Sequence, residues 1–260
     1  MKKYIDLHCH PFLEYFEQPQ AIIQEAHELG VGQIFLVGTD LRNCQEVLDL
    51  AKQFEYTHAI IGIHPNDAYE VELVDKLAEL FDETVVAIGE VGLDYHYENA
   101  PEPAKQKLIF QKQIDLAHKH NLPVMVHSRD AHEDTYQMIK AYKTKHPEQD
   151  FILHSYSSGP EYVAKYVALG VYFSFSGIVT FKNAKAMQEA CKLVPLELLF
   201  CETDVPYLAP MPYRGQTNLP QYIIETTNFV AQLKNVSIEK LLEQIWINAQ
   251  KIFKKAHLPT

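Results

Sequence analysis

The stretch Asp6-Leu7-His8-Cys9-His10 places two histidines two residues apart, directly after a short apolar run. Side chains on a β-strand alternate between its faces, so His8 and His10 project to the same side if this run is a strand. Neutral imidazole is the commonest metal ligand, and the pair therefore predicts half of a metal site. Cys9 points to the opposite face and is expected in the core. Pro11 ends the strand, because its ring removes a donor from any further ladder.

Further histidines and carboxylates follow other short apolar runs in the same way. A set of nitrogen and oxygen ligands without thiolates suits Zn²⁺, Mn²⁺ or Mg²⁺. Four histidines and two carboxylates are too many ligands for one tetrahedral ion. They are about right for two ions bridged by a carboxylate, which lie roughly 3.5–4 Å apart in such sites. The polar residues at these run ends are His8, His10, His64, Glu90, Asp94, His127, Arg129, His154, Glu202 and Asp204.

Eight apolar runs recur along the chain, and a helix-like amphipathic stretch follows each. Nearly all are continuous rather than alternating, which is typical of strands buried on both faces. The pattern predicts a (β/α)8 TIM barrel or an open doubly wound sheet. The polar run ends favour the barrel, because barrel strands converge on one catalytic rim, whereas an open sheet spreads its strand ends along a line. The expected strands are 4–7, 33–37, 59–63, 85–88, 124–126, 151–153, 171–173 and 198–201.

The stretches between these runs predict helices, and two more helices close the chain. Gly30 and Gly170 stand where a helix ends in the left-handed conformation before the next strand. Ser237 is expected to cap the last helix. We expect one hydrolase domain over residues 1–260, with 206–220 as a long loop after the eighth strand. The expected helices are 19–29, 44–54, 71–81, 104–120, 134–145, 160–169, 184–192, 219–233 and 238–256.

Composition limits the classes of partner. The chain has 23 basic and 34 acidic residues, a formal charge of −11. Such a surface repels polyanions, so any nucleic-acid chemistry must be local rather than a broad grip on duplex DNA. Four scattered cysteines fit reduced thiols in a cytoplasmic protein. No apolar segment reaches membrane-spanning length, and Asp6 and His8 interrupt any signal sequence. We expect no membrane association and no obligate protein partner.

Several motifs taken together resemble one family, the TatD-type metal-dependent deoxyribonucleases of the amidohydrolase-like barrel group. The resemblance runs from residue 6 to about residue 220. It implies a (β/α)8 barrel and a two-metal phosphodiesterase that acts on DNA. The motifs are Asp6-x-His8-x-His10, Gly62-Ile63-His64-Pro65, Gly89-Glu90-Val91-Gly92-Leu93-Asp94, His127-Ser128-Arg129, Ser176-Gly177, Thr180-Phe181-Lys182-Asn183, Glu202-Thr203-Asp204-x-Pro206-Tyr207-Leu208, Arg214-Gly215 and Asn218-x-Pro220.

The resemblance implies metal-ligand roles for six side chains, with Glu90 bridging two divalent ions. In the wider barrel group a carboxylated lysine often takes this bridging place, whereas Glu90 is a permanent carboxylate. One departure from the family follows the sixth strand. The family usually reads His-x-Phe-Ser-Gly there, and this chain reads His154-Ser155-Tyr156-Ser157-Ser158-Gly159, which puts substrate preference in question. The six implied ligands are His8, His10, Glu90, His127, His154 and Asp204.

Three cations are expected to contact substrate phosphate. Arg129 is two residues beyond His127 and therefore on the same strand face. Lys182 and Arg214 lie on the loops after the seventh and eighth strands, where barrels often bind phosphate. A solvated surface charge is the plain alternative for each of them.

Supporting roles fall to other residues of the rim. Glu90 and Asp204 are expected to be catalytic, His64 to assist catalysis or substrate binding, and Glu202 to act as a base or to orient a ligand. Asp6 is expected to hold His8 by a hydrogen bond. Rim aromatics could stack bases, although packing is the simpler interpretation for each one. These are Tyr95, His96, Tyr156, Phe181, Tyr207 and Tyr213.

The leading hypothesis is a metal-dependent deoxyribonuclease that hydrolyses phosphodiester bonds at single-stranded or frayed DNA ends. Two bound ions, Mg²⁺, Mn²⁺ or Zn²⁺, would activate the attacking water. The second hypothesis is a metal-dependent esterase or amidohydrolase, such as an aminoacyl-tRNA deacylase, since the same water can attack a carbonyl. The three cations expected to contact phosphate favour the first hypothesis, because a carbonyl substrate would not require them. A non-catalytic metal-binding scaffold is the third and weakest reading, because all six ligand positions carry competent side chains.

Overall fold

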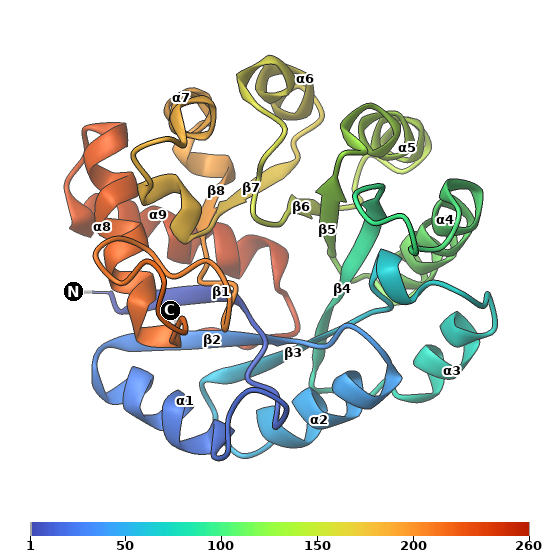
Figure 1. The fold of residues 1–260 in the computed structure, drawn as a ribbon, viewed down its shortest axis with the longest axis horizontal. Helices are drawn as coiled ribbons and strands as arrows, with labels where there is room; N and C mark the ends of the chain where they lie inside the picture. Colours follow the sequence, from blue (N-terminus) through green and yellow to red (C-terminus); the bar gives the residue numbers. More distant parts are fainter. Residues whose placement is uncertain (1, 260) are drawn as a thin grey trace.

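Eight parallel strands form one sheet in strict sequence order in the computed structural model, which describes residues 2–259. A helix on the outside follows each of the first seven strands, and Figure 1 shows these helices as a ring around the strands. The predicted (β/α)8 barrel is confirmed. The strands are β1 Tyr4–Cys9, β2 Val31–Val37, β3 Thr57–Ile61, β4 Val85–Asp94, β5 Val124–Arg129, β6 Phe151–Leu153, β7 Tyr172–Phe175 and β8 Leu199–Cys201.

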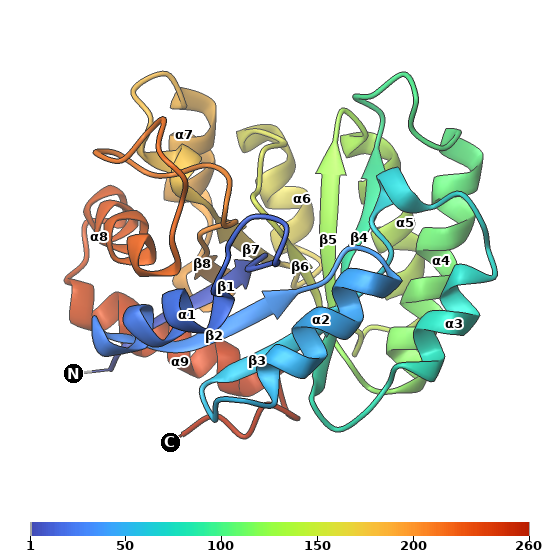
Figure 2. The same cartoon turned by 60° about the horizontal axis from the view of Figure 1, so that its bottom comes forward.

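The helices run back along the outside of the barrel, as Figure 2 shows for α2, α3 and α4. Short 3-10 turns precede four of the helices and one strand: η1 Pro65–Asp67 before α3, η2 Pro160–Tyr162 before α6, η3 Gly177–Thr180 before α7, η4 Leu196–Leu198 before β8 and η5 Pro220–Tyr222 before α8. Within residues 2–259, no helix is both long and apolar enough to span a bilayer. The helices are α1 Pro19–Glu28, α2 Leu41–Ala51, α3 Leu73–Glu79, α4 Pro103–Lys119, α5 His132–Lys145, α6 Val163–Val167, α7 Lys185–Leu193, α8 Ile223–Lys234 and α9 Ile238–Ile252.

The barrel closes where the first strand meets the segment after the last. Cys9 forms a parallel bridge with Val205, and the amide of Asp204 donates to the His8 carbonyl oxygen at 2.8 Å. The Asp6 carboxylate accepts hydrogen bonds from the backbone amide of Thr203 (2.8 Å) and from its hydroxyl (2.6 Å). Asp6 makes the expected hydrogen bond to His8, but it accepts from the backbone amide (3.4 Å) and not from the ring. Its shorter hydrogen bonds to Thr203 join β1 to the end of β8.

Local signals set most element ends. Gly30 and Gly170 have φ of +109° and +66°, so both take the left-handed region that the sequence predicted. The Ser237 hydroxyl accepts from the Lys240 amide and caps α9 as expected. Helix α2 begins at Leu41 rather than at residue 44, because the Asp40 carboxylate accepts from the Asn43 amide and caps it earlier.

Strand β4 is longer than its apolar run. It continues to Asp94 and pairs residue by residue with the end of β5, including Gly92 with His127. Gly92 has φ +147°, and a Cβ placed on it would lie 2.0 Å from the His127 carbonyl oxygen. Only glycine allows this approach, because any side chain would push the two strands apart. The close contact holds His127 beside the carboxylates of β4.

We expect His58, buried on β3, to make stability depend on pH. Burial, with a contribution from His257, lowers the pKa of His58 from 6.5 to about 4, and its Nε2 lies 2.6 Å from Gln33 Oε1. Between these two pKa values the unfolded chain binds a proton that the folded chain does not, so stability falls as pH falls from 6.5 toward 4. From pH 7 to pH 5 the wild type should lose about 2 kcal/mol more unfolding free energy than His58→Asn, in urea titrations. Equal losses would contradict this.

Candidate active site

A cavity of about 610 Å³ opens at the carboxyl ends of the strands. Its walls combine polar side chains from the strand ends with aromatic side chains from the loops. This is the end of a barrel at which enzymes of the fold carry out their chemistry. The residues argued about below that line it are His10, His64, Glu90, Asp94, His127, Arg129, His154, Asp204, Tyr15, Tyr97 and Tyr207.

The buried carboxylate of Glu90 lies at the centre of the polar wall. Its two oxygens are within 3.7 Å of a ring nitrogen from each of five histidines, which arrive on or just after β1, β3, β5 and β6. One carboxylate therefore faces all five histidines that follow the predicted apolar runs. The distances are 3.4 Å to His8, 3.5 Å to His10, 3.7 Å to His64, 2.6 Å to His127 and 3.3 Å to His154.

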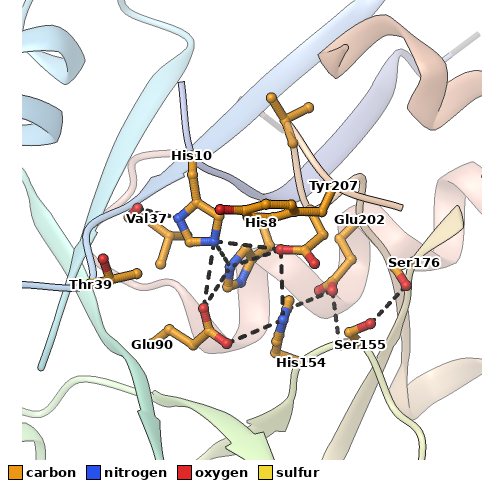
Figure 3. A network of polar contacts seen from close by, with 12 residues as sticks. His8, His10, Val37, Thr39, Glu90, His154, Ser155, Ser176, Glu202 and Tyr207 are labelled. Carbon is orange, nitrogen blue, oxygen red and sulfur yellow. Dashed lines mark hydrogen bonds and ion pairs between the residues drawn. The ribbon is translucent and has the colours of Figure 1, made fainter. Parts of the chain in front are cut away.

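Asp204 faces Glu90 across the first pair of histidines. Its Oδ1 lies 3.7 Å from His8 Nε2 and 3.5 Å from His10 Nε2, and these two nitrogens are 2.9 Å apart. Figure 3 shows the rings of His8 and His10 turned toward the same point. His8, His10 and Asp204 thus form one compact group of three ligand atoms that could hold a metal ion.

The tautomers of these rings show that a cation fits here. His10 Nδ1 lies 2.7 Å from the Val37 carbonyl oxygen, which can only accept, so Nδ1 carries the hydrogen. His8 Nδ1 lies 2.8 Å from the Met125 sulfur, also a weak acceptor. In the neutral rings both Nε2 atoms then present lone pairs to each other and to two carboxylates. Such a cluster of acceptors without donors matches the requirements of a divalent ion.

His127 and His154 are oriented by carboxylates on the far side of each ring. His127 directs Nδ1 to Glu90 and Nε2 to Asp94 Oδ2, at 2.6 and 3.1 Å. His154 directs Nε2 to Glu90 at 3.3 Å, while its Nδ1 lies 2.6 Å from Glu202 Oε1. The same Glu202 oxygen accepts from the Ser155 amide at 2.8 Å (Figure 3). Carboxylates in this position fix the tautomer and raise the basicity of a metal-binding histidine.

Burial and charge oppose each other in this site. Burial favours neutral imidazole, but the neighbouring carboxylates outweigh it and raise the pKa to about 9 for His10 and His127 and to about 10 for His154. Burial also opposes charge on Glu90, yet His154 and His127 outweigh it and hold the pKa of Glu90 well below its usual value. Protons thus balance the carboxylates in the metal-free protein, and a divalent ion would replace them.

Comparison with known proteins supports a hydrolase site. A sequence model of the family described as TatD related DNase matches residues 5–254. This chain belongs to the TatD-related DNase family. A protein of Mycoplasma pneumoniae described as an uncharacterized metal-dependent hydrolase is 38% identical, with 96% of this chain and 99% of that protein covered. YabD of Bacillus subtilis, also described so, is 35% identical, with 96% and 98% covered.

Solved structures agree with this membership. YJJV, a TatD homolog from Escherichia coli K12, superposes with a TM-score of 0.89 at 26% identity and covers 99% of both chains. The family, the fold and the ligand clusters together identify the chain as a metal-dependent hydrolase of the TatD type. The structure brings all six implied ligands into one cavity wall or its immediate support, and their individual roles stay a prediction.

The three expected phosphate contacts differ in position within this TatD-type rim. Arg129 lines the cavity, stacks on the Tyr97 ring (5.2 Å) and donates to its hydroxyl (3.1 Å). Arg214 stacks on Phe181 (4.3 Å), outside the residues that line the cavity. Lys182 is exposed and also lies outside that lining. Of the three, Arg129 is placed best to meet a substrate.

The expected aromatic stackers mostly pack elsewhere. Tyr207 lines the cavity, and its hydroxyl lies 2.6 Å from that of Tyr15. The others are engaged with protein: Tyr156 is buried against Phe173, Tyr213 stacks on Tyr222, Phe181 carries Arg214, Tyr95 donates to Asp134, and His96 pairs with Asp130.

Asp94 is a residue whose role the sequence reasoning missed. It was noted as a strand end but given no function, whereas its carboxylate supports His127 and also accepts from the His96 amide (2.9 Å). Its spacing could have revealed it. Asp94 is four residues beyond Glu90 on an extended strand, so both side chains project to the same face.

We expect Asp94→Asn to weaken metal binding, because a neutral amide no longer fixes the His127 tautomer that frees Nδ1 toward Glu90. Supporting carboxylates of this kind are typically worth about 10- to 100-fold in metal affinity. Equilibrium dialysis with divalent ions would measure the loss. The matched control is Asp130→Asn, since Asp130 is an exposed rim carboxylate that pairs with His96 and not with a rim ligand. Equal affinity in both variants would exclude this role for Asp94.

Proposed function

We propose that this chain is a deoxyribonuclease that hydrolyses phosphodiester bonds at DNA ends with the help of two divalent ions. The observation that carries the proposal is the place of Glu90, whose oxygens face two separate groups of ligands. One group is His8, His10 and Asp204, and the other is Glu90 itself with His127. The His64 ring lies beside this second group, and its Nε2 faces Glu90 at 3.7 Å. His154 faces both Glu90 and Asp204. When bound at such a site, divalent ions lower the pKa of water and neutralise charge on a phosphoryl group.

The residues of the chain have distinct tasks in this reaction. Asp204 is almost fully buried but lines the cavity, so its carboxylate can orient the attacking water and receive the proton of that water. His64 accepts from the Asn66 amide through Nδ1 (3.1 Å), which leaves its Nε2–H as a donor at the cavity wall. We assign this donor to a phosphoryl oxygen. Arg129, held on Tyr97, supplies a second and charged donor to the same group.

A DNA end suits the shape and charge of the site. The cavity of about 610 Å³ has the size of sites that enclose one small ligand, which matches a terminal nucleotide better than a long duplex. The net charge of −11 disfavours an extended grip on a polyanion. Tyr15, Tyr97 and Tyr207 at the cavity mouth offer faces on which a base can stack. The family description as a DNase agrees with this substrate.

An activity panel tests the proposal. Metal-stripped protein is reloaded with Mg²⁺, Mn²⁺ or Zn²⁺ and given single-stranded DNA, RNA or an aminoacyl ester. We expect metal-dependent release of nucleotides from DNA ends. Turnover of the ester with no cleavage of DNA would favour the esterase hypothesis instead and would overturn the nuclease.

We expect Asp204→Asn to abolish turnover while the fold remains intact. The substitution removes one negative charge from the first ligand group, and asparagine tolerates the left-handed φ of +63° at this position. The site also lies outside the packed barrel interior. Kinetics on a short oligonucleotide, with metal content and the unfolding midpoint measured beside it, would check this. An active variant would remove Asp204 from the chemistry.

We expect Arg129→Ala to lower turnover while metal content stays unchanged. Losing one charged donor to a transition-state oxygen typically costs on the order of 10²- to 10³-fold in rate. Arg214→Ala is the matched comparison, because its guanidinium stacks on Phe181 away from the cavity lining, and it should cost much less. If Arg129→Ala kept full activity, or lost its metal, Arg129 would not be the phosphate contact.

A further inference from the structure

A second group of possible ligands lies far from the rim. His118, His146 and Glu148 each offer one ligand atom, and these atoms all lie within 4.8 Å of one another. His118 is in the last turn of α4, and His146 is the C-cap residue directly after α5. Helices of a barrel run antiparallel to its strands, so both helix ends lie at the end of the barrel opposite the active site. Figures 1 and 2 show α4 and α5 beside each other.

The contacts inside this group are too long for hydrogen bonds. His118 Nδ1 lies 3.8 Å and His146 Nδ1 3.7 Å from the same oxygen, Oε1 of Glu148. A hydrogen bond between such atoms would measure roughly 2.7–3.2 Å. Bonds of about 2.0–2.2 Å to a shared zinc ion place tetrahedral ligand atoms about 3.4 Å apart. The two distances to Glu148 Oε1 are therefore within a few tenths of an ångström of the spacing around a shared ion, and all three ligand atoms lie within 4.8 Å of one another.

The surroundings of the group favour a cation. The carboxyl end of a helix carries partial negative charge, and the ends of α4 and α5 both reach this point, where Lys119, Lys143 and Lys145 partly offset it. The two imidazole rings lie 4.2 Å apart between centroids, so one ion can meet a nitrogen of each. The nearby Lys143 directs its amino group to the Gln149 carbonyl oxygen at 3.0 Å rather than to Glu148. The Glu148 carboxylate thus remains available.

We propose that His118, His146 and Glu148 bind one divalent transition-metal ion, best matched by Zn²⁺, at the end of the barrel opposite the active site. Two imidazole nitrogens and one carboxylate oxygen form a ligand set that zinc uses in proteins, with the fourth position left to water. Mg²⁺ matches this group poorly, because it prefers oxygen ligands and two of the three ligand atoms here are imidazole nitrogens. All three side chains are partly exposed, so the ion can enter from solvent. Once bound, it links the end of α4 to the segment after α5.

The number of zinc ions bound per chain tests the site without any activity assay. Full-length, metal-stripped protein is dialysed against Zn²⁺, and bound metal is counted in the wild type, His146→Asn and Glu148→Gln. We expect each variant to bind one molar equivalent less than the wild type. His257→Asn is the matched control, since it removes another exposed histidine, and it should bind as much zinc as the wild type. The same dialysis with Mg²⁺ should show no difference among the four proteins.

Repeating the measurement in the Asp204→Asn variant distinguishes zinc bound at this site from zinc bound at the rim. The loss caused by His146→Asn should be the same one equivalent in the wild type and in Asp204→Asn. Saturating Zn²⁺ should also raise the unfolding midpoint of Asp204→Asn more than that of Asp204→Asn with His146→Asn, because an ion that binds only the folded chain stabilises it. Equal zinc content in wild type, His146→Asn and Glu148→Gln would overturn the proposal. A loss seen only when Asp204 is intact would overturn it as well.

Discussion

The structure depends on one buried carboxylate that five histidines face. Glu90 lies within β4 at the rim of a hydrophobic barrel and is buried, so an unpaired charge there would cost several kcal/mol. The histidines offset that cost with protons or with metal, and they can reach Glu90 only because their strands end at the same rim. The carboxylates of Asp94 and Glu202 then face outer nitrogens of His127 and His154. The negative charge of Glu90 thus attracts one nitrogen of His127 and of His154, and a second carboxylate then faces the other nitrogen of each ring.

The fold, and the convergence of the candidate ligand side chains at one rim, could be predicted because strand ends leave a clear sequence signature. A continuous apolar run that stops at His127 or His154 reports both the strand and the direction of its last side chains. Gly30 marks the carboxyl end of α1, and Ser237 marks the amino end of α9. Both signals depend only on one residue and the backbone around it. Each of these signals depends on only one or two residues, and a barrel repeats the same strand and helix in every β/α unit. The sequence can therefore predict this architecture.

Other features depend on pairs of residues that are distant in the sequence. Nothing beside Asp6 indicates that its partner is Thr203, 197 positions away, rather than His8 two positions away. The stacking of Arg214 on Phe181 and the burial of Tyr156 are likewise properties of loops whose course the sequence does not encode locally. The same holds for the group at His118 and Glu148, since its members come from the ends of neighbouring elements.

The seam between the first and the last strand has a consequence for synthesis on the ribosome. His8 is synthesised 196 residues before Asp204, and also long before the Thr203 backbone that holds Asp6. The first ligand group therefore cannot form on a partial chain, because its two histidines are made long before Asp204, the third ligand. Metal capture by this group is thereby delayed until the segment after β8 has been made. A nascent fragment that lacks Asp204 has no complete first ligand group.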